Sequence, residues 1–241
     1  MRYLIISDIH ANLAAFEAVL ADAGPFDMAW CLGDMVGYGP DPNECIERLL
    51  ELPHICVAGN HDWAAIKKLK ISDFNPDAAR ACLWTRKQLT SQNRDYLLSL
   101  PQRIVRDDFT IVHGSPRHPI WEYILHPVTA KINFAHFDTQ FCLVGHTHVP
   151  VIFRYRPQGV CEAFPPSYHH PMPLGEDRLI INPGSVGQPR DGDPRASYAI
   201  LDPEKLTIEY RRVAYPIEVT QKRMMEKGLP LWLIKRLEFG R

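Results

Sequence analysis

The sequence predicts an α/β fold, because short apolar runs alternate along the chain with stretches of helical periodicity. The first apolar runs span residues 3–6, 28–32 and 55–58, and a continuous apolar run is typical of a strand that is covered on both faces. A helical stretch follows each of the first two runs. This alternation favours parallel βαβ units, whose functional residues gather at the carboxyl ends of the strands.

The first two helical stretches begin with known start signals. Asn12 precedes an apolar stripe that opens at Leu13, and we expect it to cap a helix. Asp41, Pro42 and Glu44 form a capping-box start with proline at the first helical position. Both helices therefore follow a candidate strand closely, as a βαβ unit requires.

The middle of the chain continues the alternation. Residues 75–100 are expected to form helices, and residues 104–112 to form two short strands joined by a tight turn. The segment 117–127 is irregular and rich in aromatic residues. Apolar runs at 141–144 and 179–181 predict two further strands.

The last third of the chain carries three more expectations. Residues 157–175 are rich in proline and histidine and have no periodicity, so we expect a loop. Residues 197–201 and 206–213 alternate well enough for an antiparallel pair of strands. The end of the chain is expected to be helical, with an interruption at residues 228–230.

Composition and charge narrow the class of protein. The chain has 241 residues, 46% of them hydrophobic and 23% charged, so we expect one globular domain over residues 1–241. The net charge of −1 gives no support to nucleic-acid or anionic-membrane binding, and no stretch approaches the ~20 apolar residues that cross a bilayer. Six cysteines lie scattered without a CxxC pair, which is typical of buried thiols in a reducing compartment. We therefore expect a cytoplasmic protein.

Five polar fragments follow the apolar runs and offer candidate metal ligands. They are Asp8-Ile9-His10, Gly33-Asp34, Gly59-Asn60-His61-Asp62, His113-Gly114 and Gly145-His146-Thr147-His148. A single fragment of this kind is more often a turn cap or a structural histidine. Their recurrence at strand ends indicates a metal centre, and a mixture of imidazole nitrogens with oxygen donors suits manganese, iron, zinc or nickel.

The chemistry of the set predicts the type of metal centre. On extended backbone, side chains two residues apart share a face, so Asp8 and His10 are expected to converge. Only two carboxylates, Asp8 and Asp34, would balance two divalent cations, which leaves roughly two positive charges for a hydroxide and an anionic substrate. Two metals about 3.5–4 Å apart suit in-line displacement at phosphorus, and a carboxylate is the natural bridge between them.

In content and order, the five fragments resemble the motifs of the calcineurin-like metallophosphoesterase superfamily, and they span most of the chain. The resemblance implies a four-layer α/β/β/α sandwich of two mixed β-sheets flanked by helices. It implies that His61 binds no metal and protonates the leaving group. The implied ligands are Asp8, His10, Asp34 and His148 for one metal, and Asp34, Asn60, His113 and His146 for the other, with Asp34 bridging.

The chain departs from the motif of one branch of the family, and this difference indicates which subfamily it resembles most. The phosphoprotein phosphatases have Asp-Arg-Gly after Gly-Asp-x-Val, which supplies a partner for the catalytic histidine and a phosphate-binding arginine. This chain has Gly37-Tyr38-Gly39 there, so compact bacterial and archaeal phosphodiesterases match better. Their turns also resemble the segments 182–185 and 188–190. Arg190 either contacts the substrate phosphate from such a turn or pairs at the surface with Asp191 or Asp193.

The sequence therefore predicts a dinuclear-metal-dependent phosphodiesterase that hydrolyses small phosphodiesters or nucleotides by hydroxide attack at phosphorus. His61 is the expected general acid, and Asn60 and Arg190 are the expected substrate-binding residues. The alternatives are a phosphomonoesterase, a Ser/Thr phosphoprotein phosphatase, and a scaffold that keeps the fold without turnover. The substrate remains open among small phosphodiesters, cyclic nucleotides, dinucleoside polyphosphates and phosphomonoesters, as do the metal identity and the oligomeric state.

The expected loop at 157–175 is a candidate for substrate selection. It follows His148 by one strand and carries Tyr168, His169 and His170. Long loops without secondary structure often have a function. We therefore expect this segment to overhang the metals and to limit the size of the substrate.

Overall fold

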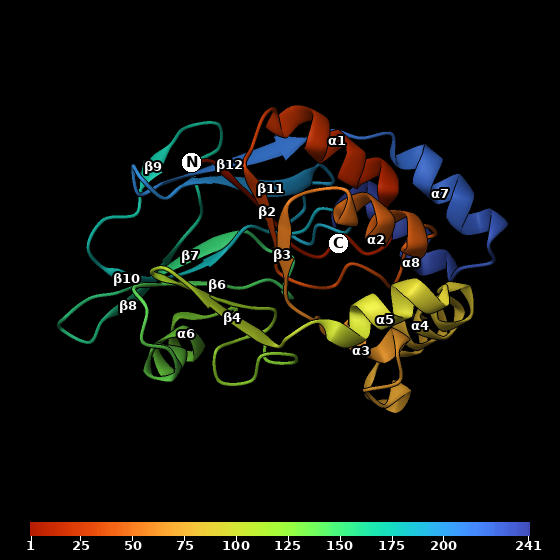
Figure 1. Ribbon diagram of the computed structural model, residues 1–241, viewed down its shortest axis with the longest axis horizontal. Coiled ribbons are helices and arrows are strands. Elements are labelled where there is room, and N and C mark those ends of the chain that lie inside the picture. The colour runs from red at the N-terminus through yellow and green to blue at the C-terminus, as the bar shows by residue number, and fades with distance from the viewer.

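The computed structural model describes all residues from 1 to 241, and two mixed β-sheets of six strands each form its centre (Figure 1). In order across the first sheet, the strands are β3 (His54–Cys56), β2 (Met28–Cys31), β1 (Tyr3–Ile6), β11 (Ala196–Asp202), β12 (Thr207–Val213) and β9 (Met172–Pro173). In the second sheet they are β4 (Arg103–Arg106), β5 (Phe109–Val112), β6 (Phe141–Leu143), β10 (Arg178–Asn182), β7 (Val151–Tyr155) and β8 (Cys161–Phe164).

The two sheets pack against each other through an aromatic and aliphatic core. Trp30 of the first sheet stacks on Tyr3, with 4.7 Å between ring centroids, and meets Phe109 of the second sheet edge-on at 5.6 Å. All three side chains are buried, in one continuous cluster that draws residues from both sheets. This shared core is the reason we propose a single domain over residues 1–241.

Helices cover the outer face of each sheet, which completes the predicted α/β/β/α layers. Phe16 of α1 (Leu13–Ala23) and Ile46 of α2 (Pro42–Leu50) pack in the cluster on the first sheet. Ala130 of α6 (Pro127–Asn133) packs on the second sheet with Cys142. The other helices are α3 (Asn60–Ala65), η1 (Ile71–Asp73), α4 (Pro76–Gln88), α5 (Ser91–Ser99), η2 (Phe134–His136), α7 (Ile217–Glu226), α8 (Leu231–Lys235) and η3 (Arg236–Phe239).

Parallel pairing brings several loops to the same end of the sandwich. In the first sheet, β1 pairs parallel with β2, and β2 with β3. In the second, β5 pairs parallel with β6. Because the carboxyl ends of parallel strands share an edge, the loops after β1, β2, β3, β5 and β6 start close together.

One predicted helix cap is confirmed and one is wrong. The Asn12 side chain accepts a hydrogen bond of 3.2 Å from the backbone N–H of Ala15, as expected of an N-cap. Helix α2 begins at Pro42 as predicted, but Asp41 makes no capping hydrogen bond. Its carboxylate lies 2.5 Å from the guanidinium of Arg223 on α7. Asp41 thus links two helices, because an ion pair stabilises a buried carboxylate more than a single hydrogen bond from a backbone N–H does.

The segment 157–175 contains two strands and is therefore not the irregular loop that its composition indicates. Strand β8 pairs antiparallel with β7 at the edge of the second sheet. Strand β9 pairs with β12 at the edge of the first. Both are edge strands with few buried positions, so they lack the apolar pattern by which a buried strand is predicted.

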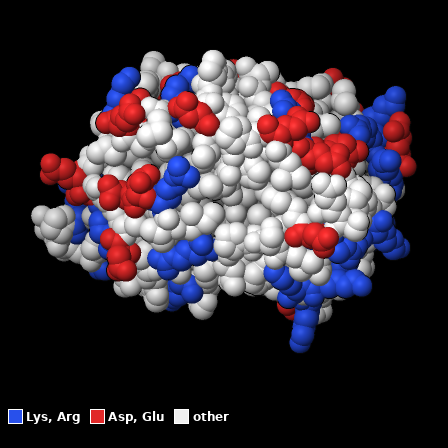
Figure 2. Space-filling model, viewed as in Figure 1, with Lys and Arg blue, Asp and Glu red and all other residues white.

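None of the helices combines the length and the apolar composition that a bilayer crossing needs. Figure 2 shows lysine and arginine mixed with aspartate and glutamate at the left and upper margins of one face, mainly lysine and arginine at its lower right, and uncharged residues over its middle.

Candidate metal centre

All seven predicted ligands come together at the end of the sandwich where the parallel strands terminate. Their side chains are buried, none being more than 3% exposed. Asp8 and His10 follow β1, Asp34 follows β2, Asn60 opens α3 after β3, His113 follows β5, and His146 and His148 follow β6. The predicted convergence of these residues is therefore present in the fold.

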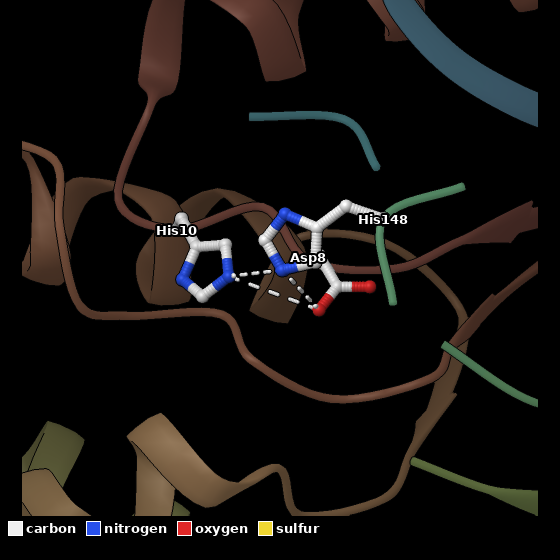
Figure 3. A group of neighbouring side chains, drawn as sticks. All are labelled: Asp8, His10 and His148. Carbon is white, nitrogen blue, oxygen red and sulfur yellow. Dashed lines mark hydrogen bonds and ion pairs between the residues drawn. The ribbon is translucent and has the colours of Figure 1, made fainter. Parts of the chain in front are cut away.

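Asp8, His10 and His148 form a first group of donor atoms and point toward one another (Figure 3). Asp8 Oδ1 lies 3.2 Å from His148 Nε2 and 3.7 Å from His10 Nε2. The two imidazole nitrogens are 3.1 Å apart. Although it is buried, Asp8 Oδ1 accepts no hydrogen bond, and a buried carboxylate oxygen without a partner is costly unless a cation lies beside it.

Asp34, His113 and His146 form a second group, which Asn60 joins. Asp34 Oδ2 lies 3.3 Å from His113 Nε2, which is 3.1 Å from Asn60 Oδ1 and 3.2 Å from His146 Nδ1. Asp34 Oδ2 is also buried without a hydrogen-bond partner. Because the same oxygen lies 3.7 Å from His10 Nε2, Asp34 reaches both groups.

Backbone carbonyls fix the tautomer of all four histidines in these groups. The outer ring nitrogens lie against carbonyl oxygens, namely His10 Nδ1 at 3.1 Å from Val36, His113 Nδ1 at 2.8 Å from Leu32, His146 Nε2 at 3.1 Å from Trp121, and His148 Nδ1 at 2.6 Å from Gln188. A carbonyl oxygen only accepts, so these nitrogens carry a proton, and in a neutral imidazole the inner nitrogen then presents its lone pair to the centre. Inward lone pairs beside two unpartnered carboxylate oxygens fit divalent cations.

Each carboxylate is oriented through its other oxygen. Asp8 Oδ2 accepts hydrogen bonds from Ser7 Oγ at 2.6 Å and from the backbone N–H of His146 at 3.0 Å. Asp34 Oδ1 accepts from the backbone N–H of His61 at 2.8 Å. Each residue is thus held by one oxygen and presents the other to the histidines.

Five of the seven candidate ligands sit on left-handed backbone. The φ angles are 54° at Asp8, 49° at His10, 54° at Asp34, 66° at His146 and 60° at His148. The extended backbone predicted between Asp8 and His10 is therefore wrong, although the two side chains do converge. Such backbone costs on the order of 1–3 kcal/mol per residue and is concentrated at functional sites.

Comparison with known proteins agrees with this geometry. A family model for the calcineurin-like phosphoesterase superfamily domain matches residues 1–206. The chain belongs to the calcineurin-like phosphoesterase superfamily. It is therefore a hydrolase of phosphoric esters, and the predicted family and fold are both confirmed.

Two relatives and one solved structure place this phosphoesterase among similar chains. The crystal structure of a metallophosphoesterase from Sphaerobacter thermophilus is 52% identical, with a TM-score of 0.92 and 100% of both chains covered. An uncharacterized protein from Methanocaldococcus jannaschii is 39% identical over 98% of this chain and 97% of its own length. The phosphodiesterase YfcE from Escherichia coli is 27% identical over 86% of this chain and 91% of its own length.

Burial keeps most of the imidazoles of the phosphoesterase neutral and ready to bind metal. It lowers the pKa of His10, His146 and His148 below the ordinary value. His113 differs, because burial acts in the same direction but the Asp34 carboxylate outweighs it and raises the pKa of His113 to about 10. A divalent cation beside Asp34 would balance the same carboxylate charge, and a His113 that binds it would be neutral.

His61 lies beside the ligand groups in a different environment. Its Nδ1 lies 3.3 Å from the thiol of Cys82 and not against a carbonyl, so it lacks the arrangement that orients the four candidate ligands. It is still close enough to His10 and Asp34 that distance alone permits metal binding. Burial, opposed by Asp34, lowers the pKa of His61 to about 4, and an anionic substrate beside the ring would act in the opposite direction.

The glycine-rich loop after Asp34 makes room for His61. Gly37 has a φ of 91° and lies against the His61 ring, where a side chain would collide with Nδ1. Tyr38 packs on the same ring, with 4.3 Å between centroids. Gly37 thus contacts His61 at the position where phosphoprotein phosphatases have a carboxylate, and Tyr38, at the position of their arginine, packs on the same ring.

A cavity of about 180 Å³ opens onto the candidate ligands. Four aromatic side chains and one arginine contribute to its walls in addition to the ligands: Tyr38, Phe74, Trp121, Tyr123 and Arg190. No function was predicted for these aromatic residues from the sequence. Trp121 and Tyr123 lie in the irregular segment 117–127, whose aromatic composition could have indicated them.

Arg190 points into this cavity and has no carboxylate partner. It donates hydrogen bonds to Tyr38 Oη at 3.3 Å and to Gln188 Oε1 at 3.1 Å. Asp191 pairs with Arg212, and Asp193 with Arg195. Surface pairing of Arg190 with either aspartate is therefore wrong, and its charge is available to an anion in the cavity.

The segment 157–175 contributes no residue to the cavity of the phosphoesterase. The Tyr168 hydroxyl accepts a hydrogen bond of 3.4 Å from Arg212 Nε on β12, and the flanking strands bind this segment to the sheet edges. The prediction that it overhangs the metals is wrong. Residues 73–78 and 121–123 form the wall instead.

Metal loading should stabilise the folded phosphoesterase, since cations would relieve the repulsion among the inward lone pairs. At a manganese concentration about 100 times Kd we expect Tm to rise by about 5–10 °C over the chelator-treated protein. Differential scanning fluorimetry measures this shift. His146→Gln should show a smaller rise because it removes a ligand of one group only, and an equal rise would argue against His146 as a ligand.

Proposed function

We propose that this phosphoesterase is a dinuclear-metal-dependent phosphodiesterase that acts on small phosphodiesters or nucleotides. The observation that carries the proposal is Asp34 Oδ2, a buried and unpartnered oxygen within 3.3 Å of His113 and 3.7 Å of His10. A carboxylate so placed suits a bridge between two metals. The nitrogen and oxygen donors favour manganese, iron, zinc or nickel over magnesium.

Each group in the site has a role in the proposed reaction. Two divalent cations supply Lewis acidity toward phosphoryl oxygens and a nucleophile at neutral pH. Arg190 and Asn60 would hold the non-bridging oxygens of the phosphodiester. Hydrolysis forms a bond from a water oxygen to phosphorus and breaks the bond to the leaving oxygen, and His61 gives that oxygen the proton it needs.

The size of the cavity and the loop at Gly37-Tyr38-Gly39 favour this function over the alternatives. A space of about 180 Å³ is small beside the roughly 300–1,000 Å³ of pockets for drug-sized ligands. The loop has Gly37 in place of the carboxylate and Tyr38 in place of the arginine of the phosphoprotein phosphatases. The scaffold alternative is disfavoured because all candidate ligands and His61 are present and buried.

A substrate panel tests the proposal. It contains bis-p-nitrophenyl phosphate, p-nitrophenyl phosphate, cyclic nucleotides and diadenosine tetraphosphate, each assayed with manganese, nickel, zinc and magnesium in turn. We expect the diester to have the higher kcat/KM of the two p-nitrophenyl compounds, with manganese or nickel more effective than magnesium. A higher value for the monoester would make the protein a phosphomonoesterase, and no turnover by metal-loaded protein would make it a scaffold.

Arg190→Met should weaken substrate binding. A hydrogen bond to a charged group contributes about 1.5–3 kcal/mol, so KM for a phosphodiester should rise about 10–100-fold. Steady-state kinetics at saturating metal measure the change. Arg195→Met is the matched control, because Arg195 is exposed, pairs with Asp193 and lies outside the cavity. If the two variants had equal KM values, Arg190 would have no part in binding.

We also propose a cytoplasmic location. All six cysteines are free thiols, and five of them are buried. Unpaired thiols in this number are typical of proteins in reducing compartments.

A further inference from the structure

The wall of the cavity next to His61 is aromatic. The Phe74 ring lies edge-on to His61, with 5.1 Å between centroids, and 5.0 Å from the Trp121 ring. Tyr123 stacks on His146 at 3.9 Å. Neither Phe74 nor Trp121 offers a metal ligand through its side chain, so the metal centre alone does not explain an aromatic wall at this place.

The aromatic wall lies beside the residue that would protonate the leaving group. His61 is the residue that would protonate the leaving oxygen, and Phe74 contacts the ring of His61. A group attached to that oxygen therefore extends along Phe74 and Trp121. Arg190, the only lysine or arginine that lines the cavity, contacts Tyr38 instead.

Polar groups flank Phe74 on both sides along the chain. Asp73 is an exposed residue that lines the cavity and forms an ion pair with no lysine or arginine; its carboxylate accepts a hydrogen bond of 3.4 Å from Ser72 Oγ. Asn75 uses its side-chain oxygen to cap α4, accepting 2.9 Å from Ala78 N–H. An unpaired carboxylate attracts hydrogen-bond donors and repels phosphate groups.

We propose that Phe74, Trp121 and Asp73 form a leaving-group subsite for a flat aromatic ring that carries hydrogen-bond donors. A single nucleoside has this chemistry, whereas a leaving polyphosphate would place its negative charges near Asp73. The cavity volume of about 180 Å³ also suits a phosphate with one ring better than it suits two nucleosides. The proposal rests on the proposed phosphodiesterase function and defines its substrate.

Two diesters, one with an aromatic and one with a saturated ring in the leaving alcohol, test whether the subsite prefers a flat aromatic ring. Benzyl methyl phosphate and cyclohexylmethyl methyl phosphate have leaving alcohols of similar size and acidity, but only the first is aromatic. Because stacking on an aromatic side chain is worth roughly 1–3 kcal/mol, we expect the wild type to prefer the benzyl ester about tenfold in kcat/KM. Phe74→Leu and Trp121→Leu should each bring this ratio close to one with unchanged metal content. Phe239→Leu and Trp232→Leu, which alter exposed residues outside the cavity, should keep it.

A second pair of compounds tests Asp73. The wild type should prefer 3-aminobenzyl methyl phosphate to the benzyl ester, and Asp73→Asn should reduce that preference and raise the relative rate on diadenosine tetraphosphate. Methyl adenosine 5′-phosphate, assayed by the release of adenosine rather than methanol, shows whether a nucleoside fills the subsite as well as a simple aryl group does. A lower kcat/KM for this ester than for the benzyl ester would restrict the proposal to aryl groups and overturn the nucleoside assignment.

A binding measurement separates failure of the subsite from failure of the proposed function. Calorimetry with benzylphosphonate and cyclohexylmethylphosphonate on the metal-loaded protein needs no turnover. Tighter binding of the benzyl compound, lost in Phe74→Leu and Trp121→Leu, supports the subsite even if no diester is hydrolysed. Equal affinities in the wild type, or an unchanged ratio in both variants, would overturn it whatever the activity of the enzyme.

Discussion

Replacing His61 by glutamine should lower kcat by about 10²–10⁴-fold, the usual effect of losing a positioned general acid. Both metals and substrate affinity should be retained, because the ring of His61 contacts Cys82, Tyr38 and Phe74 and leaves the inward donor atoms of the ligand groups intact. The loss should be greatest for alkyl phosphodiesters. A p-nitrophenolate leaves without protonation, so its esters depend least on the acid.

Elemental analysis and steady-state kinetics on both types of ester separate chemistry from metal binding in this variant. His146→Gln is the comparison, since His146 Nδ1 belongs to the second donor group and its loss should weaken one metal. If His61→Gln lost a metal instead, His61 would be a ligand. An unaltered kcat on alkyl esters would remove it from the proton transfer.

Asp34→Asn should have the broadest effect of any single substitution. It keeps the size of the side chain and the hydrogen bond from His61 N–H, but it removes the negative charge that faces both donor groups. We expect at least about 100-fold weaker binding of one or both metals, the upper end of what loss of a supporting residue causes, with activity falling in parallel.

The control for this variant is a second buried carboxylate outside the site. Asp41→Asn also removes a buried negative charge, but Asp41 pairs with Arg223 and belongs to neither donor group. Titration calorimetry with manganese should give wild-type affinity for Asp41→Asn. If both variants bound metal equally well, Asp34 would be a structural carboxylate only.

The convergence of the proposed ligands could be predicted from the sequence because each lies in the segment that follows a strand. Asp34 and His113 follow apolar runs that pair in parallel with a neighbouring strand in their own sheets, so their loops leave the sandwich at its carboxyl-end edge. The backbone conformation at these ligands could not be predicted from the sequence. Asp8 and His10 converge through left-handed φ angles held by tertiary hydrogen bonds, including His10 N–H to the Asp34 carbonyl at 3.0 Å, and no local pattern encodes those bonds.

Residues that act through tertiary contacts were missed for the same reason. Asp62 was recognised as part of its motif without a role, yet its carboxylate accepts hydrogen bonds from the backbone N–H groups of Asp34, Val36 and Gly59 at 2.9–3.2 Å and so fixes the loop that carries Asp34. Phe74 lies just before the predicted helical region 75–100, where nothing in the sequence distinguishes a core aromatic residue from one that lines a cavity. Only the fold brings it to His61.

The central claim is that Asp34 bridges two metals. A crystal structure of the manganese-loaded protein, with anomalous scattering to locate the ions and elemental analysis to count them, tests it most directly. We expect two ions per chain, with an Asp34 oxygen within about 2.0–2.2 Å of each, the usual metal–carboxylate distance. A single ion, or an Asp34 side chain more than about 3 Å from both ions, would contradict it.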